Sequence, residues 1–213
     1  MPHTKTPVVG VCGWKKSGKT TLTVRLIEEF TRRGHHVVSI KHAHHEFQVD
    51  DGPTDSARHR TAGSREICIV GGKRWAIIHQ LDNEPEPNID EVLGWMSPAD
   101  IIIVEGYKSA AIPKVEVRAS TAFSQAKLTP DDTSVIAIAT DKDEPGEIVP
   151  VLSRDDVSEI ADLIVATIGP IGKRIAEARA LARSRTAPGD SDAAMSEAIG
   201  SDDSGPPASN NGN

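Results

Sequence analysis

The chain has few aromatic residues and no excess of basic charge, and each shortage argues against a class of protein. Aromatic residues make up 3% of the sequence, which leaves few rings on which the bases of a single-stranded nucleic acid would stack. The formal net charge is −7, so no overall basic field attracts nucleic acid or an anionic membrane surface. We therefore expect neither nucleic acid nor a membrane as a partner.

Cysteines and long apolar runs are also scarce. Cys12 and Cys68 lie within apolar runs, and we expect both to be small buried side chains rather than a disulfide or a zinc site. The sequence contains no secretory hydrophobic region near its start and no apolar run long enough to span a bilayer. A reducing, cytoplasmic location is the default expectation.

What the sequence does contain is a phosphate-binding loop, Gly13-Trp14-Lys15-Lys16-Ser17-Gly18-Lys19-Thr20-Thr21, which fits the pattern G-x-x-x-x-G-K-[ST]. An apolar run, 8–12, precedes this loop, and an amphipathic segment, 19–33, follows it. Strand, glycine loop and helix start together form an anion site, because backbone N–H groups point inward and the helix dipole favours negative charge. We expect Lys19 to contact the β- and γ-phosphates and the Thr20 hydroxyl to bind Mg²⁺.

Apolar runs alternate with helical segments along the chain. Strands are expected at 8–12, 37–40, 67–70, 74–78, 101–104, 115–117 and 135–139, and helices at 19–33, 54–62, 89–96 and 155–168. This alternation predicts an α/β fold of the three-layer P-loop NTPase kind, with a mostly parallel sheet covered by helices on both faces. We expect one P-loop GTPase domain, 1–173, followed at 174–213 by a helix extension and a disordered acidic tail with too little apolar surface to fold.

A carboxylate directly follows the apolar run 101–104. Glu105 is expected at the carboxyl edge of the sheet, beside the phosphate loop, where open α/β sheets bind ligands. Its expected role is to hold a water bound to Mg²⁺, and Gly106 would allow close approach to a γ-phosphate. The simpler alternative is an ordinary glutamate at a strand end.

The polar loop after the second strand, 41–51, contains a histidine cluster and leaves three interpretations open. In the first, His42, His44 and His45 bind a transition metal, since imidazole suits several such ions. In the second, Lys41 and His42 face phosphates while Asp50 touches the metal or orients the attacking water. In the third, the segment is a solvated polar loop.

Asp141 follows the strand at 135–139, where it would border the nucleotide site. A carboxylate accepts hydrogen bonds from N1–H and N2–H of guanine, and adenine lacks that pair of donors. The position therefore favours GTP over ATP. A turn residue at a strand end is the alternative.

In combination these motifs resemble the MobB family, GTP-binding adaptors of molybdopterin-guanine dinucleotide biosynthesis. The resemblance covers about residues 7–168. It rests on the phosphate loop, Lys41-His42-Ala43-His44-His45, Val49-Asp50, Asp55-Ser56, Ala62-Gly63 and Val104-Glu105-Gly106-Tyr107-Lys108. Two positions depart from the pattern. The sequence has Pro53-Thr54 where the family often has Gly-Lys, and Trp14 stands where related dimeric P-loop ATPases carry a signature lysine.

The resemblance implies a homodimer that binds GTP and Mg²⁺, hydrolyses GTP slowly, and works with MobA, the guanylyltransferase that joins GMP to molybdopterin. It leaves open whether the protein binds molybdopterin directly. Two other functions are compatible with the motifs. One is a small-molecule kinase or ATP-dependent ligase on the same fold, and the other is a metal-binding chaperone that uses the histidine loop.

Overall fold

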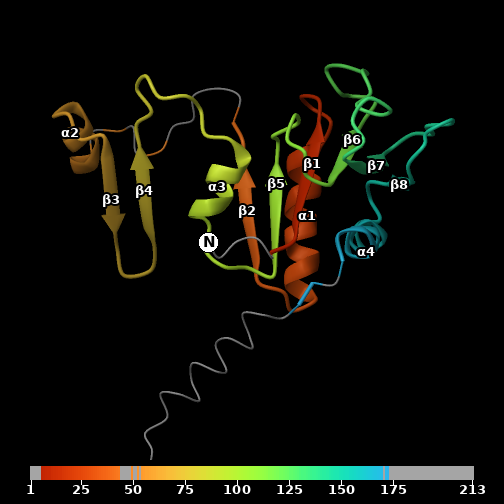
Figure 1. Ribbon diagram of the computed structural model, residues 1–213, viewed down its shortest axis with the longest axis horizontal. Coiled ribbons are helices and arrows are strands. Elements are labelled where there is room, and N and C mark those ends of the chain that lie inside the picture. The colour runs from red at the N-terminus through yellow and green to blue at the C-terminus, as the bar shows by residue number, and fades with distance from the viewer. Residues whose placement is uncertain (1–5, 44–48, 50–51, 53, 170, 173–213) are drawn as a thin grey trace, which may run out of the picture. The chain divides into compact units, whose positions relative to one another are not determined.

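Six parallel strands form the central sheet of the protein. The computed structural model describes residues 6–43, 49, 52, 54–169 and 171–172, and Figure 1 shows the arrangement. The strands lie in the order β2-β5-β1-β6-β7-β8, and every neighbouring pair is parallel. Their bounds are β1 (Val8–Gly13), β2 (Val37–Lys41), β5 (Ile101–Glu105), β6 (Lys114–Arg118), β7 (Val135–Thr140) and β8 (Val151–Ser153). The predicted α/β class is confirmed.

One face of the sheet is covered by two helices, α1 (Lys19–Arg32) and α4 (Val157–Ile168). Helix α1 buries Leu22, Leu26 and Phe30, which recur at the three- and four-residue spacing of a helix face. Helix α4 buries Ile160 and Ile164 in the same way. These side chains pack with the apolar residues of β1, β5, β6 and β7 into the main core.

The opposite face is divided into two parts. Helix α3 (Ile89–Trp95), which starts with a capping box of Asn88 and Glu91, packs Ile89 against Ile102 and Val104 in a second apolar cluster. Beyond β1, the same face carries the alternate residues of β6, which are Lys114, Glu116 and Arg118. Loops at 119–134 and 141–150 supply the partners of these charges. Helix α3 therefore covers one part of this face and loops cover the other.

A separate two-stranded antiparallel hairpin, β3 (Glu66–Val70) and β4 (Trp75–His79), follows the short helix α2 (Asp55–Thr61). The hairpin confirms the turn predicted at Gly71-Gly72, but it corrects one expectation. Cys12 is buried as predicted, whereas Cys68 is exposed, because only one face of the hairpin is covered and Cys68 lies on the other with Ile77.

The strand β8 was not predicted. It is three residues long, and its central residue is only half-buried, so it lacks the apolar run that marks the other strands. No helix within the described part of the chain is long and apolar enough to cross a membrane. The expected tail after 173 lies outside the described residues, so the domain boundary stays a prediction.

Candidate phosphate-binding site

The phosphate loop lies between the end of β1 and the start of α1. Gly13 has a φ of 143°, and a Cβ at this position would lie 2.4 Å from the carbonyl oxygen of Val117 in the neighbouring strand. Gly18 has a φ of 96° and forms the N-cap of α1. Both glycines are therefore required by backbone geometry, the first by close packing and the second by a left-handed turn.

Lys19 folds back across this loop. Its Nζ donates a hydrogen bond of 2.9 Å to the carbonyl oxygen of Trp14. Burial lowers the pKa of Lys19 below its ordinary value, and the nearby charges of Lys41 and Lys108 act in the same direction, while Glu105 opposes them. The ammonium group is therefore held over the loop, among other cations, where an anion would be attracted.

The Ser17 hydroxyl is another polar group of this loop. Ser17 is 1% exposed, and its Oγ has no hydrogen-bond partner among the described residues. Buried polar groups in proteins normally have a partner, so an unsatisfied one at a loop of this shape points to a ligand or a water.

Glu105 and Thr20 meet at the carboxyl edge of the sheet, as predicted. The Thr20 hydroxyl donates a 2.7 Å hydrogen bond to Oε1 of Glu105, which is only 8% exposed. The register of β1 against β5 pairs Val11 with Glu105 and so places this carboxylate beside the loop. A hydroxyl and a carboxylate are hard oxygen ligands of the kind that Mg²⁺ prefers, so the donor set fits this ion.

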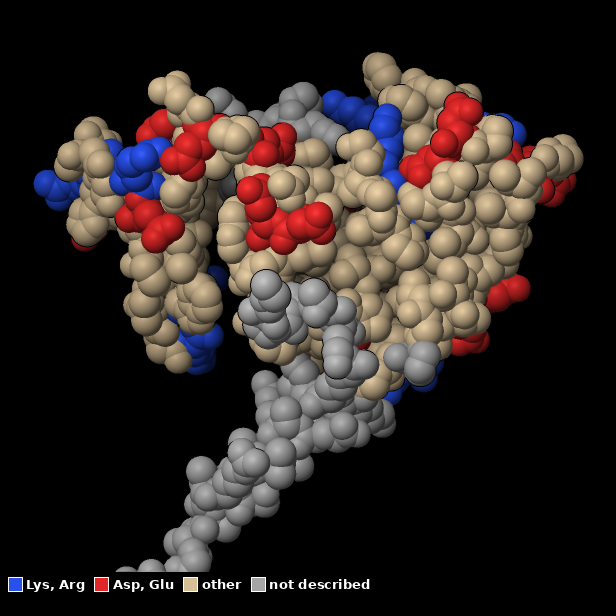
Figure 2. Space-filling model, viewed as in Figure 1, with Lys and Arg blue, Asp and Glu red and all other residues tan. Residues whose placement is uncertain are grey.

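Lys41, at the end of β2, lies on the other side of Glu105. Its Nζ is 3.6 Å from Oε1 of Glu105, so the carboxylate is held between Thr20 and a lysine. Lys15, Lys16 and Lys41 are exposed, and Figure 2 shows blue side chains along this edge of the sheet, above β5 and β1. The carboxyl edge therefore carries positive charge although the whole chain is acidic.

His42 contacts the segment that follows β5 rather than the phosphate loop. Its ring stacks on Tyr107 with 4.3 Å between centroids, and its Nδ1 accepts a 3.4 Å hydrogen bond from the Tyr107 N–H. Its Nε2 lies 2.6 Å from Oε1 of Glu86, so the tautomer with a proton on Nε2 satisfies both contacts. His42 therefore fixes the backbone at Gly106-Tyr107.

The histidine metal site remains untested. His44, His45 and Asp50 lie outside the described residues. Within the described ranges, no three histidine, cysteine or acidic side chains form a group that would hold a metal ion.

Asp141 lies at the end of β7 and already has two partners. Its Oδ2 is 3.0 Å from Nη2 of Arg154, and its Oδ1 accepts a 3.3 Å hydrogen bond from the Ser120 N–H. Arg154 also lines a hollow of about 160 Å³ beside Gly18 and Thr21, with Leu22, Arg25, Val117 and Asp155. Arg154 was not predicted as a site residue because it follows β8, the strand that was not predicted.

The loop after β6 holds the outer side of the phosphate loop. The Trp14 Nε1–H donates to the carbonyl oxygen of Ala126 at 2.6 Å, and the Phe123 N–H donates to that of Lys15 at 2.8 Å. The Thr121 hydroxyl contacts the Lys16 carbonyl at 3.3 Å. Because these contacts occupy consecutive residues of the phosphate loop, they restrain its path from outside.

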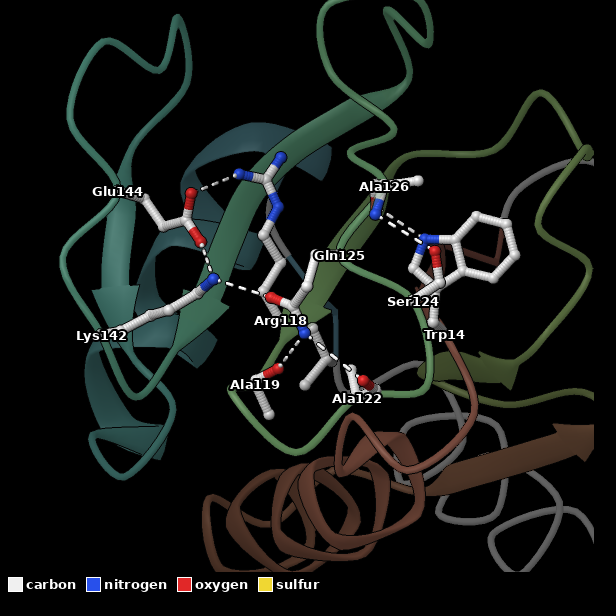
Figure 3. A pocket seen from close by; sticks show the side chains of 10 residues that line it. Trp14, Arg118, Ala119, Ala122, Ser124, Gln125, Ala126, Lys142 and Glu144 are labelled. Carbon is white, nitrogen blue, oxygen red and sulfur yellow. Dashed lines mark hydrogen bonds and ion pairs between the residues drawn. The ribbon is translucent and has the colours of Figure 1, made fainter.

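A cluster of paired charges lies next to the loop that follows β6. No pattern in the sequence indicated this cluster. Figure 3 shows Arg118 directed toward Glu144, and Lys142 between Glu144 and Gln125. We use the name balanced cluster for three cations and three carboxylates: Arg118, Lys127, Lys142, Glu116, Glu144 and Glu147.

Arg118 is the centre of the balanced cluster. Its guanidinium lies 2.7 Å from Glu116 and 2.6 Å from Glu147. Burial acts to lower the pKa of Arg118, but the hydrogen bonds and charges of these two carboxylates outweigh it and raise that pKa. The hydrogen bond from Arg118 in turn lowers the pKa of Glu147 to about 2. Each charge is matched within the cluster, so it has little capacity left for a ligand.

The chain is an α/β protein of the P-loop NTPase class. This class is defined by a strand, a glycine loop that ends in Gly18-Lys19-Thr20, a helix start and a carboxylate on the adjacent strand. The family model for molybdopterin guanine dinucleotide synthesis protein B, MobB, matches residues 8–141. The chain belongs to the MobB family.

Relatives and solved structures agree with this assignment. The molybdopterin-guanine dinucleotide biosynthesis adapter protein of Haemophilus influenzae is 36% identical over 163 residues, which span 74% of this chain and 87% of that protein. The Escherichia coli protein of the same name is 32% identical over 164 residues, 76% and 93% of the two chains. The crystal structure of Bacillus subtilis MobB matches the fold with a TM-score of 0.58 at 23% identity, covering 76% of this chain and 98% of that one.

Proposed function

We propose that this protein binds GTP with Mg²⁺ at its phosphate loop and acts as an adaptor in the synthesis of molybdopterin guanine dinucleotide. The contact between Thr20 and Glu105 is the observation that carries the proposal, because it joins the loop to the adjacent strand end through the two oxygen ligands that a metal nucleotide needs. The named adapter relatives support the pathway, and this chain spans most of their length.

Each residue of the site has a defined part in nucleotide binding. The N–H groups of the phosphate loop surround the phosphates, and Lys19 exchanges the Trp14 carbonyl for phosphate oxygens. Thr20 and Glu105 would hold Mg²⁺, which neutralises charge on the β- and γ-phosphates when bound. Ser17 has a free hydroxyl in the same loop and is a further candidate contact.

Slow hydrolysis follows from the same arrangement. Water attacks the γ-phosphorus, the bond to the bridging oxygen of GDP breaks, and a proton of the water passes to the released phosphate. Lys19 stabilises the charge that develops in this step. We assign orientation of the water to Asp50, which lies outside the described residues. Turnover is expected to be slow, since the main role is that of an adaptor.

Guanine selection is assigned to Asp141. Its carboxylate is bound by Arg154 and by the Ser120 N–H, yet a carboxylate has about four acceptor positions and so retains capacity for N1–H and N2–H of a base. The hollow lined by Gly18, Thr21 and Arg154, the ion-pair partner of Asp141, is the candidate space for the nucleoside.

Calorimetry with GTP, GDP and ATP, with and without Mg²⁺, tests the proposed function. We expect GTP to bind more tightly than ATP, and Mg²⁺ to strengthen binding of the triphosphates. Equal affinity for GTP and ATP would contradict the role of Asp141. No binding of any nucleotide would contradict the whole proposal.

We also propose a homodimer in which the hairpin β3-β4 contributes to the interface. One face of the hairpin carries exposed apolar side chains, with Val70 76%, Trp75 67% and Ile77 55% exposed. Exposed apolar surface of this kind commonly marks a protein interface. Trp75→Glu should convert the dimer to a monomer in light scattering, while Lys73→Glu at the hairpin turn should leave it a dimer.

The guanylyltransferase is the proposed partner protein. Co-purification of the two proteins, with GTP, with GDP and without nucleotide, tests this assignment. We expect retention of the partner to depend on GTP. Addition of molybdopterin to the same experiment will determine whether the pterin binds to this chain or only to the partner.

A further inference from the structure

Trp14 is a residue of the phosphate loop, and its side chain is fixed in place. It is the residue directly after the first loop glycine, and its Nε1–H is hydrogen bonded to the Ala126 carbonyl at 2.6 Å. On the face of the same ring, Nζ of Lys108 lies 3.9 Å from the ring centroid. This geometry is a cation–π contact, in which the ring's negative face attracts the ammonium group.

Lys108 belongs to the segment that leaves β5 three residues after Glu105. Its carbonyl oxygen accepts a 2.7 Å hydrogen bond from Nζ of the buried Lys114, and the Tyr107 hydroxyl donates to the Pro87 carbonyl at 3.0 Å. The stack of His42 on Tyr107 holds this segment from another side. The backbone at 106–108 is therefore fixed, while the Lys108 side chain extends to the phosphate loop.

Among the residues that the structure describes, no carboxylate is paired with the charge of Lys108. Within the described ranges no acidic side chain forms an ion pair with Lys108, whereas Lys41, Lys114, Lys127 and Lys142 each form at least one. Lys108 is also close enough to Lys19 that its charge adds to the effect of burial on the pKa of Lys19. An unpaired cation near a second cation is a favourable position for an anion.

We propose that Lys108 is a second phosphate-binding lysine, held on the Trp14 ring until a nucleoside triphosphate binds and then transferred to an oxygen of its terminal phosphate. The inference rests on the proposed nucleotide binding. The terminal phosphate is the target because Lys108 enters from the same segment as Glu105, at the metal end of the loop. The hollow lined by Arg154 lies at Gly18 and Thr21 instead.

A phosphate oxygen is a stronger partner for an ammonium group than the face of a ring, since the contact is between opposite charges and includes a hydrogen bond. The exchange involves only the side chain of Lys108, since its carbonyl remains bonded to Lys114. Trp14 thus keeps the lysine close to the site while the site is free of nucleotide.

The first test compares binding of GTP and GDP by calorimetry in the wild type, Lys108→Met and Lys108→Arg. Loss of one charged contact should weaken GTP binding by Lys108→Met about tenfold or more while GDP affinity changes little. Lys108→Arg keeps the charge and should retain most of the preference for GTP. Lys73→Met, which removes an exposed lysine of the hairpin turn, is the matched control.

The outcomes separate this inference from the proposed function. A wild type that binds neither nucleotide contradicts both. A wild type that binds GTP, with Lys108→Met unchanged or weakened equally for GTP and GDP, contradicts the role of Lys108 alone. Thermal unfolding of each variant controls for loss of folded protein.

The second test observes the Trp14 ring itself. The chain has three tryptophans, so Trp75→Phe with Trp95→Phe leaves Trp14 as the only indole. GTP with Mg²⁺ should change its fluorescence as the ammonium leaves the ring, and GDP should change it less. Adding Lys108→Met to this background should remove the difference between GTP and GDP. A difference that persists would overturn the proposed transfer.

Discussion

Two groups of charged side chains flank the phosphate loop. They contain similar residue types but differ in how their charges are paired. On the β5 side is the lysine group, defined as Lys19, Lys41 and Lys108 with the single carboxylate Glu105. On the β6 side is the balanced cluster around Arg118. The lysine group is partly exposed and has more cations than carboxylates, whereas the balanced cluster is matched and its carboxylates are largely buried.

The difference shows that pairing, rather than residue type, distinguishes a candidate anion site from a structural element in this protein. Buried charges are tolerated in the balanced cluster because each ion pair and hydrogen bond offsets the cost of leaving water. The lysine group lacks that compensation and would gain it from the polyphosphate that we propose as its ligand. Substitutions in the lysine group should therefore affect binding, and substitutions in the balanced cluster should affect stability.

The largest expected effect is that of Lys19→Ala on GTP binding. Removal of the ammonium group that crosses the loop should weaken GTP affinity by about 100-fold or more, since several charge-assisted contacts are lost together. Hydrolysis should fall below detection, while the free energy of unfolding changes little. Calorimetry and urea denaturation measure the two quantities. Strong destabilisation by Lys19→Ala would contradict the proposal that the lysine group serves binding and the balanced cluster serves stability.

Glu116→Ala should have the largest effect on stability. Glu116 is fully buried, and its removal leaves Arg118 without its 2.7 Å partner and Leu128 N–H without an acceptor. Breaking a buried pair of this kind costs about 3–5 kcal/mol in the free energy of unfolding. Urea denaturation followed by circular dichroism measures the loss. Glu28→Ala on the exposed side of α1 is the control, and a loss no greater than that of Glu28→Ala would argue against the cluster as a stabilising element.

Acid should weaken the balanced cluster through Glu147. The folded-state pKa of Glu147 is lowered from 4.5 to about 2 by its hydrogen bond with Arg118. Its contribution to stability is therefore fully present above pH 4.5 and is lost as the pH falls toward 2. A shift of this size corresponds to roughly 3 kcal/mol. The difference in unfolding free energy between wild type and Glu147→Gln should shrink over this range, and a constant difference would contradict the assignment.

Lys127→Ala should have the smallest effect. Its side chain is 45% exposed, and Arg118 continues to pair with Glu147 when it is removed. Exposed ion pairs contribute about 0.2–1 kcal/mol, so the loss in unfolding free energy should be of this order. Urea denaturation at low salt measures this loss, since urea is uncharged and, unlike guanidinium chloride, does not screen the ion pairs. A loss as large as that of Glu116→Ala would show that exposure does not rank the members of the cluster.

Much of the fold was predictable because its strands are apolar runs. Buried parallel strands such as β5 contain uninterrupted Ile and Val residues, and the phosphate loop has a sequence pattern set by backbone geometry. Strand β8 lacks such a run and was not predicted. Arg154, which follows this strand and pairs with Asp141, was therefore not predicted either. The prediction for Cys68 was wrong because the two-stranded hairpin carries apolar residues on a face that no described part of the chain covers.

The two charged groups also differ in how far they could be predicted from the sequence. Glu105 was predictable because its position follows from a strand and a known edge of the sheet. The balanced cluster was not, because the partners of Arg118 include Glu144 and Glu147, 26 and 29 residues further along in a loop. The contact between Trp14 and Lys108 likewise depends on the path of the segment after β5, which no local pattern specifies.

The two cysteines differ in exposure, and this difference makes one of them a selective site for chemical labelling. Burial raises the pKa of Cys12 to about 12, so this thiol stays protonated and inert at neutral pH. Cys68 is exposed on the hairpin and is the remaining thiol of the chain. A maleimide dye should therefore attach at a single position without any engineered cysteine. The rate of that reaction, followed against protein concentration, would report by an optical signal whether a second copy covers the hairpin, as proposed.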